Sequence, residues 1–206
     1  EAPLQYGDFA RWQREFLGNG RAERQLEFWR RTLSGCETQI SLPTDYSRMG
    51  SQSYRGGTYT TKVDPNIVKG INELAHRCHA TTFMVLLAAL QAVLYRYTGE
   101  VDIVLGTSTF NRKRPEFESL AGFFVNTLAL RGHVNPSASF FDLVVKARGT
   151  ALDAFENEDV PYDRVVETAR PVRSAEGFSL FHLVIEFQSG VAQSLSLEGL
   201  HTRPFE

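Results

Sequence analysis

One asparagine needs a chemical explanation more than any other residue of this 206-residue chain. The run AGFFVNTLALR, residues 121–131, reads as a buried strand, and alternation along a strand sends Phe124, Asn126 and Leu128 to one face. An amide among large apolar side chains costs free energy unless it is hydrogen-bonded. Two interpretations stay open: a structural hydrogen bond that ties the strand to a neighbouring loop, or a polar group that projects into a cleft and contacts an amide or a pantetheine-like substrate.

Three residues on one predicted helix have the types that bind metals. These are His76, Cys78 and His79, and two histidines three positions apart can share a metal ion. No further ligands follow at a suitable spacing, and Cys78 fits the apolar stripe of the helix. The pattern therefore favours two surface histidines beside a core cysteine, and no metal site is expected.

Charged residues gather in two further places. Glu156, Glu158 and Asp159 could supply paired carboxylates for acid–base chemistry. Capping of the following helix by Asp159, with both glutamates facing water, is the simpler interpretation. The basic run Arg-Lys-Arg at residues 112–114 could attract a phosphate, but a solvated loop is favoured.

Composition and motifs argue against several classes of function. A net charge of −2, with both signs interspersed, does not predict a nucleic-acid or membrane-surface patch. The sequence contains no G-x-S-x-G elbow, P-loop lysine motif or strand-linked G-x-G-x-x-G. The most apolar run, residues 83–95, is shorter than the roughly 20 residues of a membrane span. With no signal peptide visible at the start, we expect a cytoplasmic protein with Cys36 and Cys78 reduced.

The elements that must position these residues alternate along the chain. Apolar periodicity predicts helices near residues 9–17, 22–33, 65–78, 82–98, 140–155 and 161–169. β-prone runs predict strands at residues 58–63, 102–110, 121–131 and 181–188. The expected N-caps are Asp8, Asp64, either Thr81 or Thr82, and Ser139. Helices that cover a sheet make a layered α/β sandwich, and the length suits one large domain or two small ones.

Four ordered motifs resemble those of the condensation domains of nonribosomal peptide synthetases. YGDFARW, residues 6–12, matches that family's Y-x-D-F-A-x-W, and GFFVNTLALR, residues 122–131, closely matches G-x-F-V-N-T-x-x-x-R. ENEDVPYDRVVE, residues 156–167, is similar to H-Q-D-x-P-F-E, and SLFHLVIEFQ, residues 179–188, to the final P-L-F-Q-V strand. LPTDYSR and LGTSTFNRKRPE are also characteristic stretches. The natural order and spacing make this signal specific.

The chain also departs from the family pattern. The third motif differs at Asn157, Glu158, Tyr162 and Asp163, and the R-D-x-S-R segment before the last strand is reduced to RSAEG. The catalytic H-H-x-x-x-D-G motif lies upstream of Y-x-D-F-A-x-W in the family, and no His-His pair occurs in this sequence. We therefore expect residues 1–206 to be the C-terminal lobe of a condensation domain, inactive without the lobe that carries the catalytic histidine.

The resemblance implies a fold and an activity. Condensation domains resemble chloramphenicol acetyltransferase, with two α/β lobes in a V and a substrate tunnel between them. The amine of the acceptor attacks the donor thioester, and an amide bond forms. Donor and acceptor arrive on phosphopantetheine arms of carrier proteins, so no directly bound cofactor is expected. The implied partners are the N-terminal lobe, the carrier proteins and a neighbouring adenylation domain, with no nucleic acid and no membrane.

The resemblance also implies roles for particular residues. Those expected to line the substrate tunnel are Gly122, Phe124, Asn126, Thr127, Asn111 and Arg112. Those expected to act structurally between the lobes are Arg131, Trp12 and Asp159. Arg131 is expected to pair with the aspartate of the missing motif, or else to be a surface cation. No catalytic or metal-binding residue is expected in this chain.

Two competing interpretations remain at this point. Some condensation-like domains have lost catalysis and recruit partner proteins, and the altered NEDVPYD and RSAEG segments permit such a binding platform. An epimerization domain fits less well, because the G-x-F-V-N-T-L form is more typical of condensing members.

Overall fold

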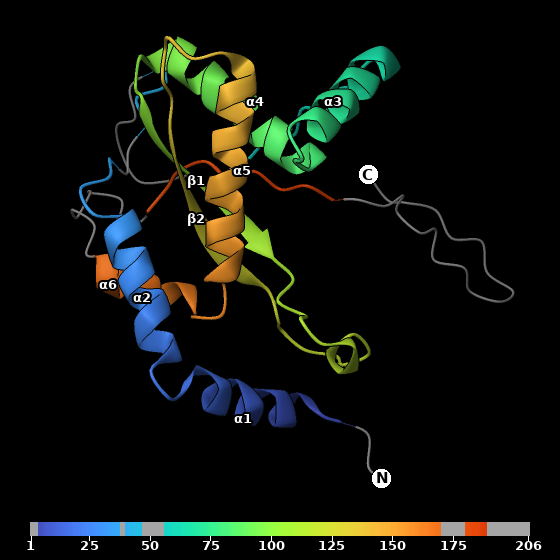
Figure 1. Cartoon of the computed structure of the whole chain (residues 1–206), viewed down its shortest axis with the longest axis vertical. Helices are drawn as coiled ribbons and strands as arrows, with labels where there is room; N and C mark the ends of the chain where they lie inside the picture. The colour runs from blue at the N-terminus through green and yellow to red at the C-terminus, as the bar shows by residue number, and fades with distance from the viewer. Residues whose placement is uncertain (1–3, 38–39, 47–55, 170–179, 189–206) are drawn as a thin grey trace, which may run out of the picture.

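An antiparallel pair of strands forms the centre of the protein (Figure 1). The computed structural model describes residues 4–37, 40–46, 56–169 and 180–188. Strand β1 (Asp102–Thr109) pairs along its whole length with β2 (Asn126–His133), and Leu105 lies opposite Leu130. Strand β1 is rich in β-branched residues, which suit a half-buried pleated surface, and β2 contributes the buried apolar run from Leu128 to Leu130. The strand prediction for residues 102–110 is confirmed.

An extended segment runs beside the other edge of β1. The backbone N–H of Gly106 donates to Leu183 O at 2.8 Å, and the N–H of Ile185 donates to Gly106 O at 2.9 Å. These bonds form an isolated parallel bridge between Gly106 and Val184. The strand predicted at residues 181–188 is therefore present as an extended segment with too few ladder bonds to count as a full strand.

Two long helices pack on the sheet. Helix α4 (Thr82–Thr98) begins at Thr81, one of the two predicted caps, where Thr81 Oγ1 accepts from Met84 N, and it ends at Gly99 with φ of 76°. Helix α5 (Phe140–Glu156) begins where Ser139 Oγ accepts from Asp142 N. The helices contact each other, and α5 runs along β2 (Figure 1).

The remaining helices surround this centre. Helix α2 (Arg21–Thr32) packs against α6 (Tyr162–Ala169), and α1 (Tyr6–Leu17) precedes them. The 3-10 turn η1 (Pro115–Phe117) lies in the loop between the strands. Helix α3 (Pro65–Arg77) starts at Asp64, whose carboxylate accepts from Asn66 N at 2.7 Å, and it extends away from the sheet (Figure 1).

The main core joins the sheet to α2, α4, α5 and α6 and to the C-terminal part of α3. Its fully buried side chains include Trp29, Leu87, Ile103, Leu130 and Val144. Burial of a large apolar side chain contributes about 1.5–3 kcal/mol, so this cluster is the principal source of stability. The α/β organisation that the sequence predicts is confirmed.

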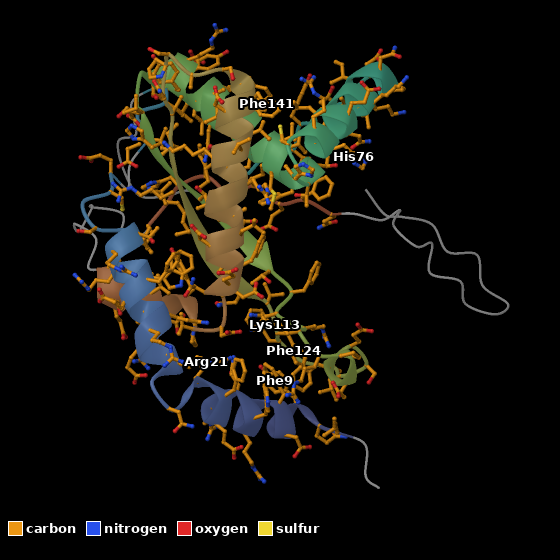
Figure 2. All side chains as sticks on the ribbon, viewed as in Figure 1. Phe9, Arg21, His76, Lys113, Phe124 and Phe141 are labelled. Atoms are coloured by element: carbon orange, nitrogen blue, oxygen red, sulfur yellow. The ribbon has the colours of Figure 1, made fainter. Side chains whose placement is uncertain are left out.

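A second, smaller cluster holds α1 against the loop between the strands. Phe9, Phe117 and Phe124 form it, and Trp12 and Leu120 pack around them. The rings of Phe9 and Phe124 lie 4.4 Å apart between centroids and are tilted by 50°, and Figure 2 shows both side chains next to α1 at the base of the molecule. The cluster is separate from the main core, so α1 and this loop form a unit of their own.

Several local predictions were wrong. Residues 58–63 have no regular structure and are exposed, because a strand needs a hydrogen-bonded neighbour and not only β-prone residues. Asp8 lies inside the first turn of α1, where its carboxylate accepts from Gln5 N, so Asp8 is not the cap. The apolar stripe of α3 is covered only near its C-terminal end, and Ile67 and Val68 are exposed.

Among the described residues, no single helix is long and apolar enough to cross a membrane. Helices α3 and α4 reach the necessary length and hydropathy only when taken together, and they are bent by 104° relative to each other.

Candidate functional site

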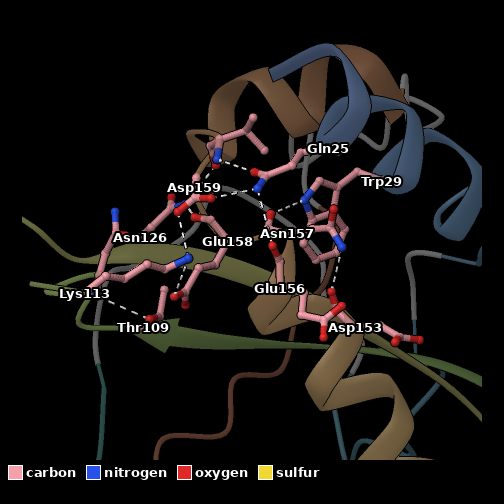
Figure 3. A network of polar contacts seen from close by, with 12 residues as sticks. Gln25, Trp29, Thr109, Lys113, Asn126, Asp153, Glu156, Asn157, Glu158 and Asp159 are labelled. Atoms are coloured by element: carbon pink, nitrogen blue, oxygen red, sulfur yellow. Dashed lines mark hydrogen bonds and ion pairs between the residues drawn. The ribbon is translucent and has the colours of Figure 1, made fainter. Parts of the chain in front are cut away.

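Asn126 stands where β2 begins and binds the turn formed by residues 156–162. Its amide Nδ2 donates to Glu158 O at 2.7 Å (Figure 3) and to Val160 O at 2.8 Å, and its Oδ1 accepts from Tyr162 N at 3.2 Å. An amide has two donors and one acceptor oxygen, and all are used here. This is the loop-tying hydrogen bonding that the structural interpretation of Asn126 requires.

Helix α2 binds the same turn from another direction. Gln25 Nε2 donates to Asp159 Oδ2 at 2.8 Å, and Gln25 Oε1 accepts from Val160 N at 3.1 Å. The indole of Trp29 donates to Asn157 O at 2.8 Å. Buried backbone groups need such partners, and here side chains from distant elements supply them (Figure 3).

Lys113 adds an ion pair from the loop between the strands. Its Nζ lies 2.7 Å from Asp159 Oδ1 and 3.1 Å from Glu158 Oε1. Burial acts to lower the pKa of Lys113, but the hydrogen bond to Asp159 and the charges of both carboxylates outweigh it and raise the pKa. The 156–162 turn is therefore fixed by the loop, β2 and α2 together.

Two sequence predictions at this turn were wrong. Glu158 is buried rather than facing water, although Glu156 is exposed as predicted. The Asp159 carboxylate contacts Gln25 and Lys113. These contacts replace the helix-capping role that its position just before the helix suggested. These partners lie 134 and 46 positions away in the sequence, so no local pattern pointed to them.

The predicted tunnel residues of the 110–125 loop make internal contacts. The Arg112 guanidinium lies 4.0 Å from the centroid of Phe124 and donates to Phe117 O. Gly122 lies against the ring of Tyr6, where an added Cβ would come within 2.1 Å of a ring carbon. Asn111 has φ of 49°, a left-handed conformation that asparagine tolerates. Contact of these residues with a tunnel stays a prediction.

Arg131 has a carboxylate partner within the chain. Its Nε and Nη2 bind the two oxygens of Asp102 at 2.8 and 2.6 Å, and its Nη1 donates to Thr32 O and Ser34 O. The hydrogen bond to Asp102 raises the pKa of Arg131 further. It is thus no mere surface cation, because it joins both strands to the end of α2. Its pairing with an aspartate of another lobe stays a prediction.

Trp12 and Thr127 have simpler environments. The indole of Trp12 stacks on Phe16 and contacts Phe117, and Arg114 lies over it. Thr127 lies opposite Ser108 in the ladder and is half-buried. The surroundings of Trp12 and Thr127 do not test the roles that the family resemblance implies for these two residues.

A cavity of about 820 Å³ opens where β1 ends. Most of its lining comes from four segments: the start of α4, the second half of α5, the end of β1 and residues 186–188; Val125, just before β2, adds to it. The lining residues are Thr81, Phe83, Met84, Thr107, Ser108, Thr109, Phe110, Val125, Leu152, Phe155, Glu186, Phe187 and Gln188. None of the six predicted tunnel residues is among them, although Val125 and Phe110 are direct neighbours of Phe124, Asn126 and Asn111.

Sequence reasoning missed this cavity because four elements build it. One signal was available: TSTF at residues 107–110 interrupts a buried strand with three hydroxyl-bearing residues. No sequence pattern indicated that α4 and α5 contribute to the cavity, since their lining residues belong to ordinary amphipathic patterns. Within the described residues, no group of three His, Cys, Asp or Glu could hold a metal ion, and Cys36 and Cys78 are free thiols.

Comparison with known proteins identifies the family. The family model of the condensation domain matches residues 1–203. The chain belongs to the condensation-domain family. Malpinin synthetase of Mortierella alpina is 38% identical over 201 residues, a match that covers 98% of this chain and 3% of that protein. This condensation-domain chain therefore spans only a small part of the synthetase that it matches.

Solved structures agree with the predicted fold. The SgcC5 protein of Streptomyces globisporus, crystallised with a naphthyl ethanediol and sucrose, is 32% identical with a TM-score of 0.69, over 82% of this chain and 38% of that one. The X-domain in the complex with OxyB from teicoplanin biosynthesis is 27% identical with a TM-score of 0.73, over 82% of this chain and 39% of that one. The condensation-domain chain thus has the α/β fold of these larger proteins.

Proposed function

We propose that this chain is the C-terminal lobe of a condensation domain that forms an amide bond between a donor acyl or peptidyl group and an acceptor aminoacyl group. Both groups are held as thioesters on phosphopantetheine arms of carrier proteins. The observation that carries the proposal is the match of the condensation-domain model along the chain, from residue 1 to residue 203. The partners are the other lobe, the carrier proteins and an adenylation domain.

The lengths of the related structures support the assignment to one lobe. The chain covers 38% and 39% of the two solved chains described above. The order of its motifs corresponds to the second half of the family pattern. The catalytic histidine would come from the other lobe, and this lobe would supply one wall of the tunnel and part of the acceptor side.

The polar network of the 156–162 turn supports a positioning role. Holding two reactants in a productive geometry supplies much of the acceleration of a bimolecular reaction, and a displacement of about 1 Å can remove it. Asn126, Lys113 and Gln25 fix this turn to β2, the inter-strand loop and α2. In this proposal the turn and the start of β2 belong to the tunnel wall, and these bonds hold the wall in place before substrate arrives.

A partner-recruiting platform is the second candidate. A specific observation favours it: the similar X-domain forms a complex with OxyB. That likeness concerns another protein, whereas the match of the condensation-domain model and the synthetase relative at 38% identity both support the condensing function.

The test is peptide formation by the separately expressed lobes with two loaded carrier proteins. We expect product, detected by mass spectrometry, only when this chain and an N-terminal lobe with its His-His motif are both present. Lobes that bind each other and the carriers but give no product would overturn the condensing function and favour the platform.

Asn126→Ala in the complete domain gives a second test, of the tunnel wall. We expect slower peptide formation because the wall loses its attachment to the 156–162 turn. Full activity in a normally folded variant would remove Asn126 from the tunnel wall while leaving the condensing function intact.

A further inference from the structure

The cavity at the end of β1 combines apolar walls with one charge. Seven of its lining residues are large and apolar, and four of these are unusually exposed: Phe110 at 74%, Phe187 and Leu152 at 42%, and Val125 at 39%. Ligand pockets have volumes of about 300–1,000 Å³ and mostly apolar linings with a few placed polar groups. The volume and lining of this cavity suit a ligand with a large apolar group.

A single carboxylate is held at the rim. Among the described lining residues, Glu186 is the only charged one. Ser108 Oγ donates to Glu186 Oε1 at 2.7 Å, which fixes the direction of the carboxylate. Its second oxygen, Oε2, accepts no hydrogen bond from the part of the chain that the structure describes. An ionised carboxylate accepts hydrogen bonds and attracts a cation, so the free oxygen suits an amine.

From these observations, and resting on the proposed function, we propose that the cavity binds the acceptor aminoacyl group and selects one with a large apolar side chain. The side chain lies against Phe83, Phe155 and Leu152, and the amine lies at Glu186. An acidic acceptor is repelled by Glu186, and a small one leaves the apolar wall uncovered. Glu186 is thus a specificity-determining residue against acidic acceptors, and Ser108 is the residue that positions it.

The pantetheine arm alone fits these observations less well. Its amide N–H groups can reach a carboxylate, but they carry no positive charge, and the arm lacks a group large enough to cover the four phenylalanine rings. Charge complementarity and cavity size therefore both favour the aminoacyl group over the arm.

The first experiment measures kcat/KM of the complete domain for N-acetylcysteamine thioesters of phenylalanine, alanine and aspartate as soluble acceptors. We expect kcat/KM for the phenylalanine thioester to exceed that for the alanine thioester by about tenfold or more, and to exceed that for the aspartate thioester by a larger factor. Equal values for all three overturn the selection while leaving the condensing function intact. No product from any acceptor is a failure of the condensing function, and the binding experiment below then decides the cavity separately.

A matched pair of variants tests the location. Leu152→Glu places a charge on the cavity wall, and Val145→Glu places one on the same helix at a residue that is 41% exposed and outside the cavity. We expect only Leu152→Glu to lower kcat/KM for the phenylalanine thioester, by about tenfold. Equal effects of the two variants would overturn the placement of the side chain in this cavity.

Direct binding measurements test whether the amine of the ligand contacts Glu186. Phenylalaninamide, 3-phenyllactamide and free pantetheine are titrated against the complete domain by calorimetry. We expect phenylalaninamide to bind most tightly, and Glu186→Gln to reduce its affinity about tenfold without changing that of 3-phenyllactamide. Tighter binding of pantetheine, no binding of phenylalaninamide, or equal sensitivity of both amides to Glu186→Gln would each overturn the assignment.

Discussion

The amide of Asn126 makes three hydrogen bonds to a turn more than thirty residues away in the sequence. At the scale of single residues, such contacts decide which side chains are replaceable. A partner group left buried without a hydrogen bond costs about 1–3 kcal/mol, and Glu158 and Val160 are both buried. Asn126 therefore contributes to stability whatever it does in the tunnel.

Asn126→Ala should lower the free energy of unfolding by about 2–4 kcal/mol, because two carbonyls and one N–H lose their partner together. Urea denaturation followed by circular dichroism measures this loss. Thr127→Ala is the matched control: its side chain is half-buried and lies one residue further along β2, and we expect a change of less than about 1 kcal/mol. Equal losses would contradict the role of the amide.

Lys113 should make stability depend on pH in the alkaline range. Its pKa in the folded protein is raised above the usual 10.5. A raised pKa contributes stability that is complete below the pKa of the unfolded chain and is lost as the pH rises through the folded-state value. Lys113→Met should therefore cost about 1–2 kcal/mol at neutral pH, a low value because the side chain is 36% exposed and screened by solvent.

The difference in the free energy of unfolding between Lys113→Met and the unsubstituted protein should become smaller above about pH 10.5, because Lys113 loses its charge there. Unfolding curves across this range measure it. Lys146→Met, at an exposed position of α5, serves as the control and should show little difference at any pH. If the difference in the free energy of unfolding for Lys113→Met stays constant through the alkaline range, the charge of Lys113 is not what stabilises the turn.

At the scale of elements, the segment at residues 181–188 depends on one glycine of β1. Gly106 binds it through both its N–H and its carbonyl, and the Phe181 ring occupies the space where a Cβ would stand, with a ring carbon only 2.2 Å from that position. Without a side chain at Gly106, the ring can lie directly on β1. The position of the cavity wall that carries Glu186 depends on this contact.

Gly106→Ala should displace Phe181 and lower the free energy of unfolding by about 1–3 kcal/mol. Hydrogen exchange should also become faster at the amide of Ile185, which donates to Gly106 O. Gly149→Ala is the control, because that glycine lies inside α5 with no atom within 4 Å of an added Cβ, and it should increase stability by about 0.5–1 kcal/mol. Unchanged exchange at Ile185 in Gly106→Ala would contradict the contact.

At the scale of the whole molecule, the two apolar clusters divide the protein into a large unit and a small one. The main core joins the sheet to five helices, α2 to α6, and the aromatic cluster joins α1 to the loop between the strands. Regions with few buried contacts open at lower free energy than the core. The small unit should therefore open without unfolding the sheet.

Phe9→Ala should remove hydrogen-exchange protection from α1 and residues 115–125 while β1, β2 and α5 keep theirs. Phe9 is the most buried member of the small cluster, so its truncation leaves a cavity there and not in the main core. Mass spectrometry of peptic fragments measures this pattern. Leu105→Ala, in the main core, should instead lower protection throughout, and the same uniform loss in Phe9→Ala would mean that the protein has one cooperative unit.

Local sequence signals determined the boundaries of most helices. Asp64 and Ser139 cap their helices as predicted, Thr81 is one of the two caps predicted for α4, and Gly99 ends α4, because a cap involves only residues within one turn of each other. Ordered motifs likewise determined the family, since a motif is a short run of residue types. The α/β organisation followed from the alternation of these elements.

The tertiary structure decided what depends on distant partners. Residues 58–63 have strand-forming composition but no regular structure, and the partners of Arg131, Lys113 and Asn126 lie about 30 to 100 residues away in the sequence. The cavity at the end of β1 takes its walls from four separate elements. A single sequence records which residues can bury, pair or donate, but the choice of partner is made only when the packed elements bring those residues within hydrogen-bonding distance.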